Sequence, residues 1–353
     1  MAGARSRAAR IVGLAAAGVL AHAAWRAATR PRGTLTGEVA LITGGSRGLG
    51  LLIARELARE GCSIAICARD ERELARARDE LAARGARVTA FRCDVADREQ
   101  VETLVRLVTD RFGRIDILVN NASVIQVGPL ESMTVGDFER AMAVNFWGTV
   151  YTTLAVLPQM RRRRAGRIVN IASIGGVVAV PHLLPYDAAK FAVRGFSEGL
   201  RSELAGTGIT VTTVVPGLMR TGSPINAFFK GRAAQEYAWF SVAAATPLTA
   251  MSAPRAARRI VDAVARGEAE VTLTWQARLL GLVHDLFPGA TTKLLGRVSR
   301  LLPAAEGGTD RNVRGVDLST AVLPSPLTVL MARAARRNNQ LGGPAEQQVS
   351  RRS

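Results

Sequence analysis

Short apolar runs alternate with helix-length segments from residue 38 to residue 273, and this alternation constrains the fold more than any other feature of the chain. Runs this short, rich in Val, Ile and Ala, are typical of strands buried on both faces. Strands separated by helices pair in parallel, so the pattern predicts an α/β fold with a doubly wound parallel sheet. The predicted strands are 39–43, 63–68, 88–93, 115–120, 167–172, 209–215 and 270–273, and helices are predicted over 49–59, 71–84 and 98–112.

This pattern predicts a single catalytic domain over residues 37–275, with an extension at each end. The N-terminal extension, residues 1–32, holds six Arg and no acid, and its segment 11–25 is apolar apart from His22. At about 15 residues this segment is short for a membrane span, which needs about 20. Three interpretations stay open: an uncleaved membrane anchor, a signal peptide cleaved near Ala21-His22-Ala23, and a soluble or interfacial helix.

The C-terminal extension has two parts. Residues 276–303 carry clustered apolar residues interrupted at Pro288-Gly289, which predicts two amphipathic helices. Their apolar faces fit core packing, a membrane-facing surface or a dimer-forming surface. Residues 304–353 are poor in aromatics and rich in Gly, Arg and Gln, so we expect a low-complexity, largely disordered tail with at most a short helix near 328–336.

The net charge of +18 comes from 47 Lys and Arg against 29 Asp and Glu. Much of the excess lies in the extensions, and no basic patch interleaved with aromatics is present, so we expect no nucleic-acid partner. The three cysteines, Cys62, Cys67 and Cys93, lie in or beside predicted strands, which indicates buried free thiols. The three histidines are scattered, and we expect no metal site.

The first predicted strand runs into a glycine-rich turn, Thr43 to Gly50, that opens a helix. This is the context of a phosphate-binding loop: Gly44 permits the tight turn, Gly48 lets the backbone approach a pyrophosphate, and Gly50 lets the helix pack closely. The helix N-terminus offers N–H groups to the anion.

The charge near the end of the second predicted strand indicates which dinucleotide binds. An acid there would bond the ribose 2′-hydroxyl of NAD, but the strand ends in Ala68 followed by Arg69. Arg47, in the glycine-rich turn, adds a second guanidinium. Two guanidinium groups suit a 2′-phosphate, so NADP(H) is favoured over NAD(H).

A third group of residues suits proton transfer. Tyr186 and Lys190 are four residues apart, which places them on one face of a helix. A neighbouring ammonium favours the phenolate, so we expect the pKa of Tyr186 to fall toward the working pH. Ser173, at the end of a predicted strand, is placed to hydrogen-bond a substrate oxygen.

With these motifs in order, the chain resembles the short-chain dehydrogenases/reductases from about residue 37 to at least residue 270. The turn matches at Thr43, Gly44, Gly48 and Gly50, and the catalytic residues match at Asn145, Ser173, Tyr186 and Lys190. The family's Asn-Asn-Ala-Gly motif appears with Ser123 in place of its Gly. The cofactor-binding residues that these arguments and the resemblance together indicate are Gly44, Ser46, Arg47, Gly48, Leu49, Gly50, Arg69, Asp94, Val95, Asn121, Ala122, Tyr186, Lys190, Pro216, Gly217 and Thr221.

The resemblance implies a single domain of the Rossmann type, often assembled as a homo-oligomer. It also implies an NADP(H)-dependent oxidoreductase that interconverts a ketone and a secondary alcohol. Tyr186 would act as general acid and base, with its pKa kept low by Lys190 and the oxidised nicotinamide. Lys190 would also hold the nicotinamide ribose, and Ser173 would orient and polarise the carbonyl. Asn145 would hold a water that links Lys190 to solvent.

The expected substrate is a small apolar carbonyl compound or alcohol, in keeping with a lipid-like molecule, because two segments that line the pocket in this family are apolar here. They are residues 174–185 and the stretch after Pro216 that contains Met219, Ile225, Phe228, Phe229, Tyr237, Trp239 and Phe240. The alternative is a 3-oxoacyl-thioester reductase, whose surface Arg residues would attract an acidic carrier. A remote alternative is a non-catalytic nucleotide-binding scaffold. A catalytic domain that uses the cytosolic nicotinamide pool is expected to be cytoplasmic, membrane-anchored through residues 11–25 if the first interpretation of that segment holds.

Overall fold

The computed structural model describes residues 31–246, 250–305, 307–318 and 333–340. Contacts divide the chain into two compact units, Met1–Thr34 and Leu35–Ser353. The fold and the site described below belong to the second unit. The apolar segment 11–25 lies outside the described residues, and among the residues that are described no helix is long and apolar enough to cross a membrane.

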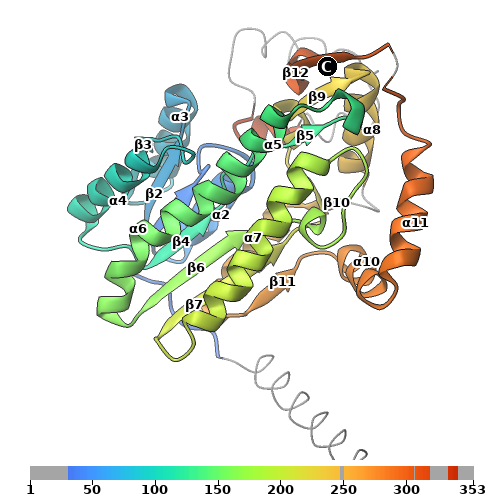
Figure 1. The fold of residues 1–353 in the computed structure, drawn as a ribbon. Coiled ribbons are helices and arrows are strands. Elements are labelled where there is room, and N and C mark those ends of the chain that lie inside the picture. The colour runs from blue at the N-terminus through green and yellow to red at the C-terminus, as the bar shows by residue number, and fades with distance from the viewer. Residues whose placement is uncertain (1–30, 247–249, 306, 319–332, 341–353) are drawn as a thin grey trace, which may run out of the picture. The chain divides into compact units, whose positions relative to one another are not determined.

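The central sheet has seven parallel strands in the order β11-β7-β6-β4-β1-β2-β3 (Figure 1). Every strand predicted from the sequence is present, with ends that move by at most two residues, so the doubly wound Rossmann-type fold is confirmed. The strands are β1 (Val39–Thr43), β2 (Ser63–Ala68), β3 (Val88–Arg92), β4 (Ile117–Asn120), β6 (Gly166–Ile171), β7 (Ile209–Val215) and β11 (Glu270–Thr272).

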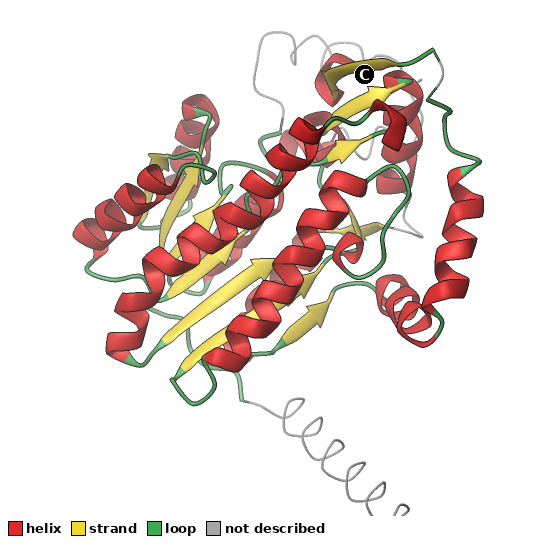
Figure 2. Cartoon of the chain, in the orientation of Figure 1, coloured by secondary structure: helices red, strands yellow, loops and turns green. Residues whose placement is uncertain are grey.

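Helices cover both faces of this sheet (Figure 2). Alternate residues of β1 point to opposite faces: Ala40 and Ile42 belong to one buried cluster, while Val39 and Leu41 belong to the other. The first cluster includes residues of α2 (Gly48–Arg59), α3 (Glu71–Ala83) and α9 (Ala253–Arg266). The second includes residues of α4 (Arg98–Phe112), α6 (Gly148–Arg163) and α7 (Leu184–Glu203).

Local sequence signals set the ends of these helices. Asp70 caps α3 by accepting a hydrogen bond from the Glu73 N–H, and Asp97 caps α4 by accepting from the N–H groups of Glu99 and Gln100. Helix α4 ends at Gly113, whose φ of 84° is in the left-handed region that favours glycine.

Shorter elements form a second layer near the carboxyl end of the sheet (Figure 1). Their core contains Phe229, Tyr237, Phe240 and Leu183. The strands pair in two small sheets, β10-β8 and β12-β9-β5. The elements are β5 (Gln126–Val127), α5 (Val135–Ala141), β8 (Leu218–Arg220), β9 (Phe228–Gly231), α8 (Ala233–Ala245), β10 (Ala250–Ser252), β12 (Thr309–Arg314) and α12 (Gly315–Leu318), with short 3-10 helices at Leu130–Ser132, Ile174–Gly176 and Ser223–Asn226.

The two helices predicted after the catalytic domain are present as α10 (Trp275–Leu286) and α11 (Pro288–Ser299), separated at Phe287. Only part of their apolar surface packs inward. Leu280 and Leu295 pack against a small cluster around Val178, whereas Leu286 and Phe287 are each 62% exposed.

The expectation of a largely disordered tail from residue 304 does not hold for the parts that the structure describes. Strand β12 pairs antiparallel with β9, and residues 333–337 form a helical turn followed by three residues that contact the domain. These segments are ordered by polar contacts with the domain, such as the bond from the Asn312 side chain to the carboxylate of Asp137. Composition gives no sign of such long-range contacts.

Candidate functional site

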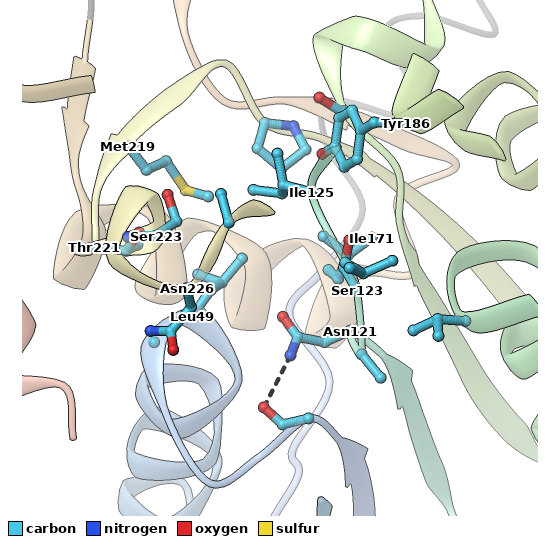
Figure 3. Close-up of a pocket in the computed structure, with 18 of the residues that line it drawn as sticks. Leu49, Asn121, Ser123, Ile125, Ile171, Tyr186, Met219, Thr221, Ser223 and Asn226 are labelled. Atoms are coloured by element: carbon cyan, nitrogen blue, oxygen red, sulfur yellow. Dashed lines mark hydrogen bonds between the residues drawn. The ribbon is translucent and has the colours of Figure 1, made fainter. Parts of the chain in front are cut away.

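A cavity of about 820 Å³ lies at the carboxyl ends of the central strands. β1 has β2 on one side and β4 on the other, so the strand order reverses there, and ligands bind at such switch points in open α/β sheets. Figure 3 shows Leu49 and residues 219–226 across the cavity from Asn121, Ser123 and Ile171. Predicted site residues that line the cavity are Gly44, Ser46, Arg47, Gly48, Leu49, Arg69, Asp94, Val95, Asn121, Ala122, Ser173, Tyr186, Lys190, Pro216, Gly217 and Thr221.

The glycine-rich turn requires its glycines. Gly44 and Gly48 have φ values of +62° and +57°, which side chains rarely adopt. Gly50 does not line the cavity, but a Cβ there would lie 2.2 Å from the Gly44 carbonyl oxygen and 2.5 Å from Nδ2 of Asn121. Gly50 is therefore closely packed, with the turn itself and Asn121 as the neighbours.

The Asn-Asn-Ala-Ser segment after β4 holds the turn in place. The Asn121 side chain donates to the carbonyl oxygens of Thr43 and Gly44 at 3.0 and 3.1 Å. Figure 3 shows one hydrogen bond of this side chain as a dashed line. The Thr43 hydroxyl accepts from the N–H groups of Asn121 and Ala122. Thr43, which the sequence suggested only as part of the turn, thus joins the end of β1 to the segment after β4.

At the end of β2, both predicted cations have carboxylate partners. Arg47 contacts Glu73 at 2.6 Å, and the Ser46 hydroxyl donates to the same carboxylate at 3.0 Å. Arg69 lies 3.7 Å from Asp94 and is more exposed. An anion binding here would compete with Glu73 for Arg47. Glu73 was not identified from the sequence, because it lies in α3, 26 residues after Arg47.

Ser173, Tyr186 and Lys190 come together on one wall of the cavity, as predicted. Ser173 follows β6, and Tyr186 and Lys190 lie in the first two turns of α7. The Lys190 ammonium nitrogen is 5.6 Å from the centre of the Tyr186 ring. It also donates to the carbonyl oxygen of Ile171 at 2.9 Å, which fixes the lysine against the end of β6.

The expected fall in the pKa of Tyr186 does not occur. Burial raises the pKa of Tyr186 to about 12, against an opposing effect of the Ser173 hydroxyl. Burial also lowers the pKa of Lys190 from 10.5 to about 7. Burial thus favours the uncharged form of both side chains: the protonated phenol of Tyr186 and the neutral amine of Lys190. The positive charge on Lys190, which was expected to stabilise the phenolate, is therefore itself disfavoured.

Asn145 lies in a π-helical turn, Met142–Trp147, and does not line the cavity. Its side chain accepts from the Val124 N–H at 2.7 Å and donates to the Val124 carbonyl at 3.0 Å. Both polar atoms of the side chain are used in holding the segment after Asn121. Such π-helical turns often occur at functional sites. The geometry shows a positioning role, and the water-holding role implied by the resemblance is untested.

A buried polar network attaches α7 to the sheet, and the sequence gave no sign of it. The Asn120 side chain donates to Asn170, the Asn170 side chain donates to the Ser197 hydroxyl, and Ser197 pairs with Thr213 at 2.8 Å. These residues belong to β4, β6, α7 and β7. The network fixes the helix that carries Tyr186 and Lys190.

Asp187 is a second residue that sequence reasoning missed. Its carboxyl is buried beside Tyr186, where it accepts from the Val180 N–H at 2.7 Å, and burial raises its pKa to about 8. At neutral pH Asp187 is therefore largely protonated and adds little negative charge next to the tyrosine.

The substrate end of the cavity is mainly apolar. Of the seven residues expected there after Pro216, Met219, Phe228, Trp239 and Phe240 line the cavity. The other three, Ile225, Phe229 and Tyr237, are buried outside it. His182 does not line the cavity; its ring contacts the buried carboxylate of Glu236, which also accepts from the Trp239 indole.

The three cysteines are free and buried, as the sequence predicted. Cys67 and Cys93 lie at the ends of β2 and β3, and both line the cavity.

Comparisons with known proteins agree with this geometry. Residues 38–228 match the short chain dehydrogenase family model. The chain is 35% identical over 274 residues to "Putative oxidoreductase SadH" of Mycobacterium tuberculosis, which covers 76% of this chain and 98% of that protein.

Solved structures give the same result. A short-chain dehydrogenase from Streptomyces avermitilis has a TM-score of 0.65 and 31% identity, over 75% of this chain and 98% of that one. A variant of actinorhodin polyketide ketoreductase with NADPH has a TM-score of 0.61 and 33% identity, over 68% of this chain and 97% of that one. The fold, the glycine-rich turn, the grouping of Ser173, Tyr186 and Lys190 and these matches show that the chain is an oxidoreductase of the short-chain dehydrogenase/reductase family.

Proposed function

We propose that this oxidoreductase uses NADP(H) to interconvert a ketone and a secondary alcohol on an apolar substrate. The observation that carries the proposal is a single cavity that joins the phosphate-binding turn to Ser173, Tyr186 and Lys190 and then to an apolar end. The positive φ values of Gly44 and Gly48 and the polar groups at the adenosine end fit a nicotinamide dinucleotide. When bound, that cofactor supplies the hydride.

The residues of the chain supply and move the proton. With its pKa near 12, Tyr186 is protonated at neutral pH and can donate its proton to a carbonyl oxygen as negative charge develops there. The Ser173 hydroxyl stabilises the same oxygen. Lys190, with a pKa near 7, is suited to return a proton to the phenolate. The complete set of these groups argues against a non-catalytic scaffold.

The preference for NADP(H) rests on Arg47 and Arg69, which flank the end of β2 where that strand offers Ala68 and no acid. The NADPH in the related polyketide ketoreductase supports the same choice. The preference is tested by comparing the Kd values of NADPH and NADH. Glu73→Gln should tighten NADPH binding and leave NADH binding unchanged, because it frees Arg47 from a competing carboxylate. Equal affinities for both cofactors would contradict the preference.

The apolar substrate class rests on the side chains that the cavity presents beyond Tyr186, among them Met219, Phe228 and Trp239. The direct experiment is a screen of NADPH oxidation by the purified protein against apolar ketones and acyl thioesters. Turnover confined to small polar ketones would contradict the proposed class.

A second candidate is reduction of 3-oxoacyl thioesters, which the match to a polyketide ketoreductase favours. Such a substrate reaches the site on a carrier, whereas a free lipid ketone does not. Comparing turnover of a carrier-linked 3-oxoacyl thioester with that of a free steroid ketone separates the two.

Association into a homo-oligomer is also part of the proposal. Trp147, Leu154 and Phe191 are between 41% and 55% exposed, and they lie in the π-helical turn, in α6 and in α7. Large apolar side chains this exposed are common at subunit interfaces. Light scattering after gel filtration tests this, and a monomer at micromolar concentration would contradict it.

We further propose that the segment from α10 to Leu301 associates with an anionic membrane surface. It carries nine of the 17 large apolar side chains that are exposed among the described residues. The same stretch, residues 275–302, contains Arg278, Lys293, Arg297 and Arg300 against the single acid Asp285. Apolar side chains mixed with cations suit the interface of an anionic bilayer.

The test is co-sedimentation of the full chain with vesicles of phosphatidylglycerol and phosphatidylcholine. Leu282→Glu combined with Leu286→Glu should reduce binding, whereas Leu107→Glu, at an exposed apolar position of α4, should not. Equal binding by all variants would contradict a role for this segment.

A further inference from the structure

The C-terminal segment 333–340 lies across the glycine-rich turn, although it is almost 300 residues away in the sequence. Residues 333–337 are helical, and the next three residues carry most of the polar contacts. Ala335, Asn338 and Gln340 are buried, so the segment is packed against the domain.

Asn338 and Asn339 bind the turn and the helix beside it. The Gly48 N–H, at the start of α2, donates to the Asn338 carbonyl oxygen at 2.8 Å. The Asn339 side chain donates to the carbonyl oxygens of Ser46 and Glu73 at 2.8 and 3.0 Å. Arg76 of α3 donates to Asn339 at 2.7 Å. These contacts span the turn and α3, where the proposed adenosine 2′-phosphate would lie.

Gln340 binds the 221–226 segment, which also lines the cavity. Its side chain donates to the Thr221 carbonyl at 2.8 Å and accepts from the Asn226 side chain at 2.8 Å. A Cβ on Gly48 would lie 2.9 Å from Nε2 of Gln340, so the side chain passes directly over the turn. Gln340 is itself one of the residues that line the cavity.

We propose that residues 333–340 form a strap that closes the dinucleotide cavity over the glycine-rich turn and must open before the cofactor can leave. The strap contacts both the turn and the 221–226 segment, and both line the cavity, so the strap lies against the part of the cavity where a dinucleotide would bind the turn. The inference rests on the proposed function as a dinucleotide-dependent enzyme and adds a set of cofactor-retaining residues to it.

Closure fits the geometry better than competition with the cofactor. The cavity retains about 820 Å³ with Gln340 in its wall, and it still reaches from Arg69 to Tyr186. The Asn338 carbonyl uses one N–H of α2, whereas the first turn of a helix offers up to four. Space for a ligand therefore remains in the cavity beside the strap.

The experiment compares the full chain with the double variant Asn339→Ala/Gln340→Ala. NADPH affinity is measured by fluorescence titration, and the dissociation rate by stopped-flow displacement with excess NADP+. We expect the dissociation rate to rise about tenfold or more, because the hydrogen bonds that hold the strap closed must break before the cofactor leaves. Arg333→Ala, at an exposed position of the same segment, serves as the matched control and should match the wild type.

Three results would overturn the proposal. Unchanged affinity and dissociation rate in the double variant would show that the strap does not retain the cofactor. Tighter NADPH binding would show that the segment competes with the cofactor. If the wild type binds neither NADPH nor NADH while a melting curve shows that it is folded, the proposed function fails together with the strap. The first two results overturn the strap alone.

Discussion

Replacing Lys190 by Met should stabilise the protein at low pH while it removes catalysis. Lys190 is buried, and its nearest polar contact is the carbonyl oxygen of Ile171. Burial lowers the pKa of its ammonium group from the ordinary value of 10.5 to about 7 in the folded protein. The unfolded chain therefore binds a proton that the folded protein releases, and this difference favours unfolding.

The size of the effect follows from the two pKa values. Each pH unit between them corresponds to about 1.4 kcal/mol, so the penalty is about 5 kcal/mol below pH 7 and disappears as the pH rises to 10.5. Met removes the penalty but leaves the Ile171 carbonyl without its donor, which costs about 1–3 kcal/mol. The variant should thus gain about 2–4 kcal/mol at pH 6 and lose that advantage by about pH 10.

The assay is urea unfolding without added cofactor at pH 6, 8 and 10, with NADPH oxidation as the readout of activity. Lys230→Met is the matched control, because Lys230 is also buried but is paired with the Asp137 carboxylate. Breaking that pair should destabilise the protein by about 3–5 kcal/mol. A uniform loss of stability at every pH in Lys190→Met would refute the reasoning.

Three further predictions concern neighbouring positions. The folded protein holds the proton of the Asp187 carboxyl more tightly than the unfolded chain does, so the wild type loses stability as the pH rises from 3.8 toward about 8. Asp187→Asn should remove this pH-dependent loss of stability. Parallel pH profiles of the free energy of unfolding for the wild type and the variant would contradict this. Gly50→Ala should weaken NADPH binding by more than about tenfold, because its Cβ would overlap the Gly44 carbonyl oxygen, and an unchanged Kd would count against it. Asn170→Leu should lower the melting temperature and cost about 2–3 kcal/mol, since it leaves buried partners unsatisfied; an unchanged melting temperature would contradict it.

The fold was predictable because its signal is local and repeated. β1 and β2 are buried on both faces, so they are continuous apolar runs in the sequence. The helices after β2 and β3 begin at the polar caps Asp70 and Asp97. The short strands of the second layer gave no such signal. β5 and β8 have two and three residues, and their pairing depends on contacts from distant parts of the chain.

The site was predictable where a residue type at a fixed spacing performs the chemistry. The turn, Tyr186, Lys190 and Ser173 meet in one cavity as expected. The sequence could not show that Glu73 forms an ion pair with Arg47, because the pairing depends on how α3 packs. It also could not show that burial raises the pKa of Tyr186 and lowers that of Lys190, because both effects depend on solvent exclusion in the fold. The contacts of Gln340 required the three-dimensional fold.

The central claim is that Tyr186 transfers the proton in an NADP(H)-dependent reaction. It is tested most directly by Tyr186→Phe, which removes only the phenolic oxygen. NADPH oxidation is measured with the best ketone from the screen, and NADPH binding is measured by fluorescence on the same preparation. We predict a fall in turnover of at least about 10²-fold with the Kd of NADPH within about twofold of the wild type. Normal turnover by Tyr186→Phe would contradict the claim.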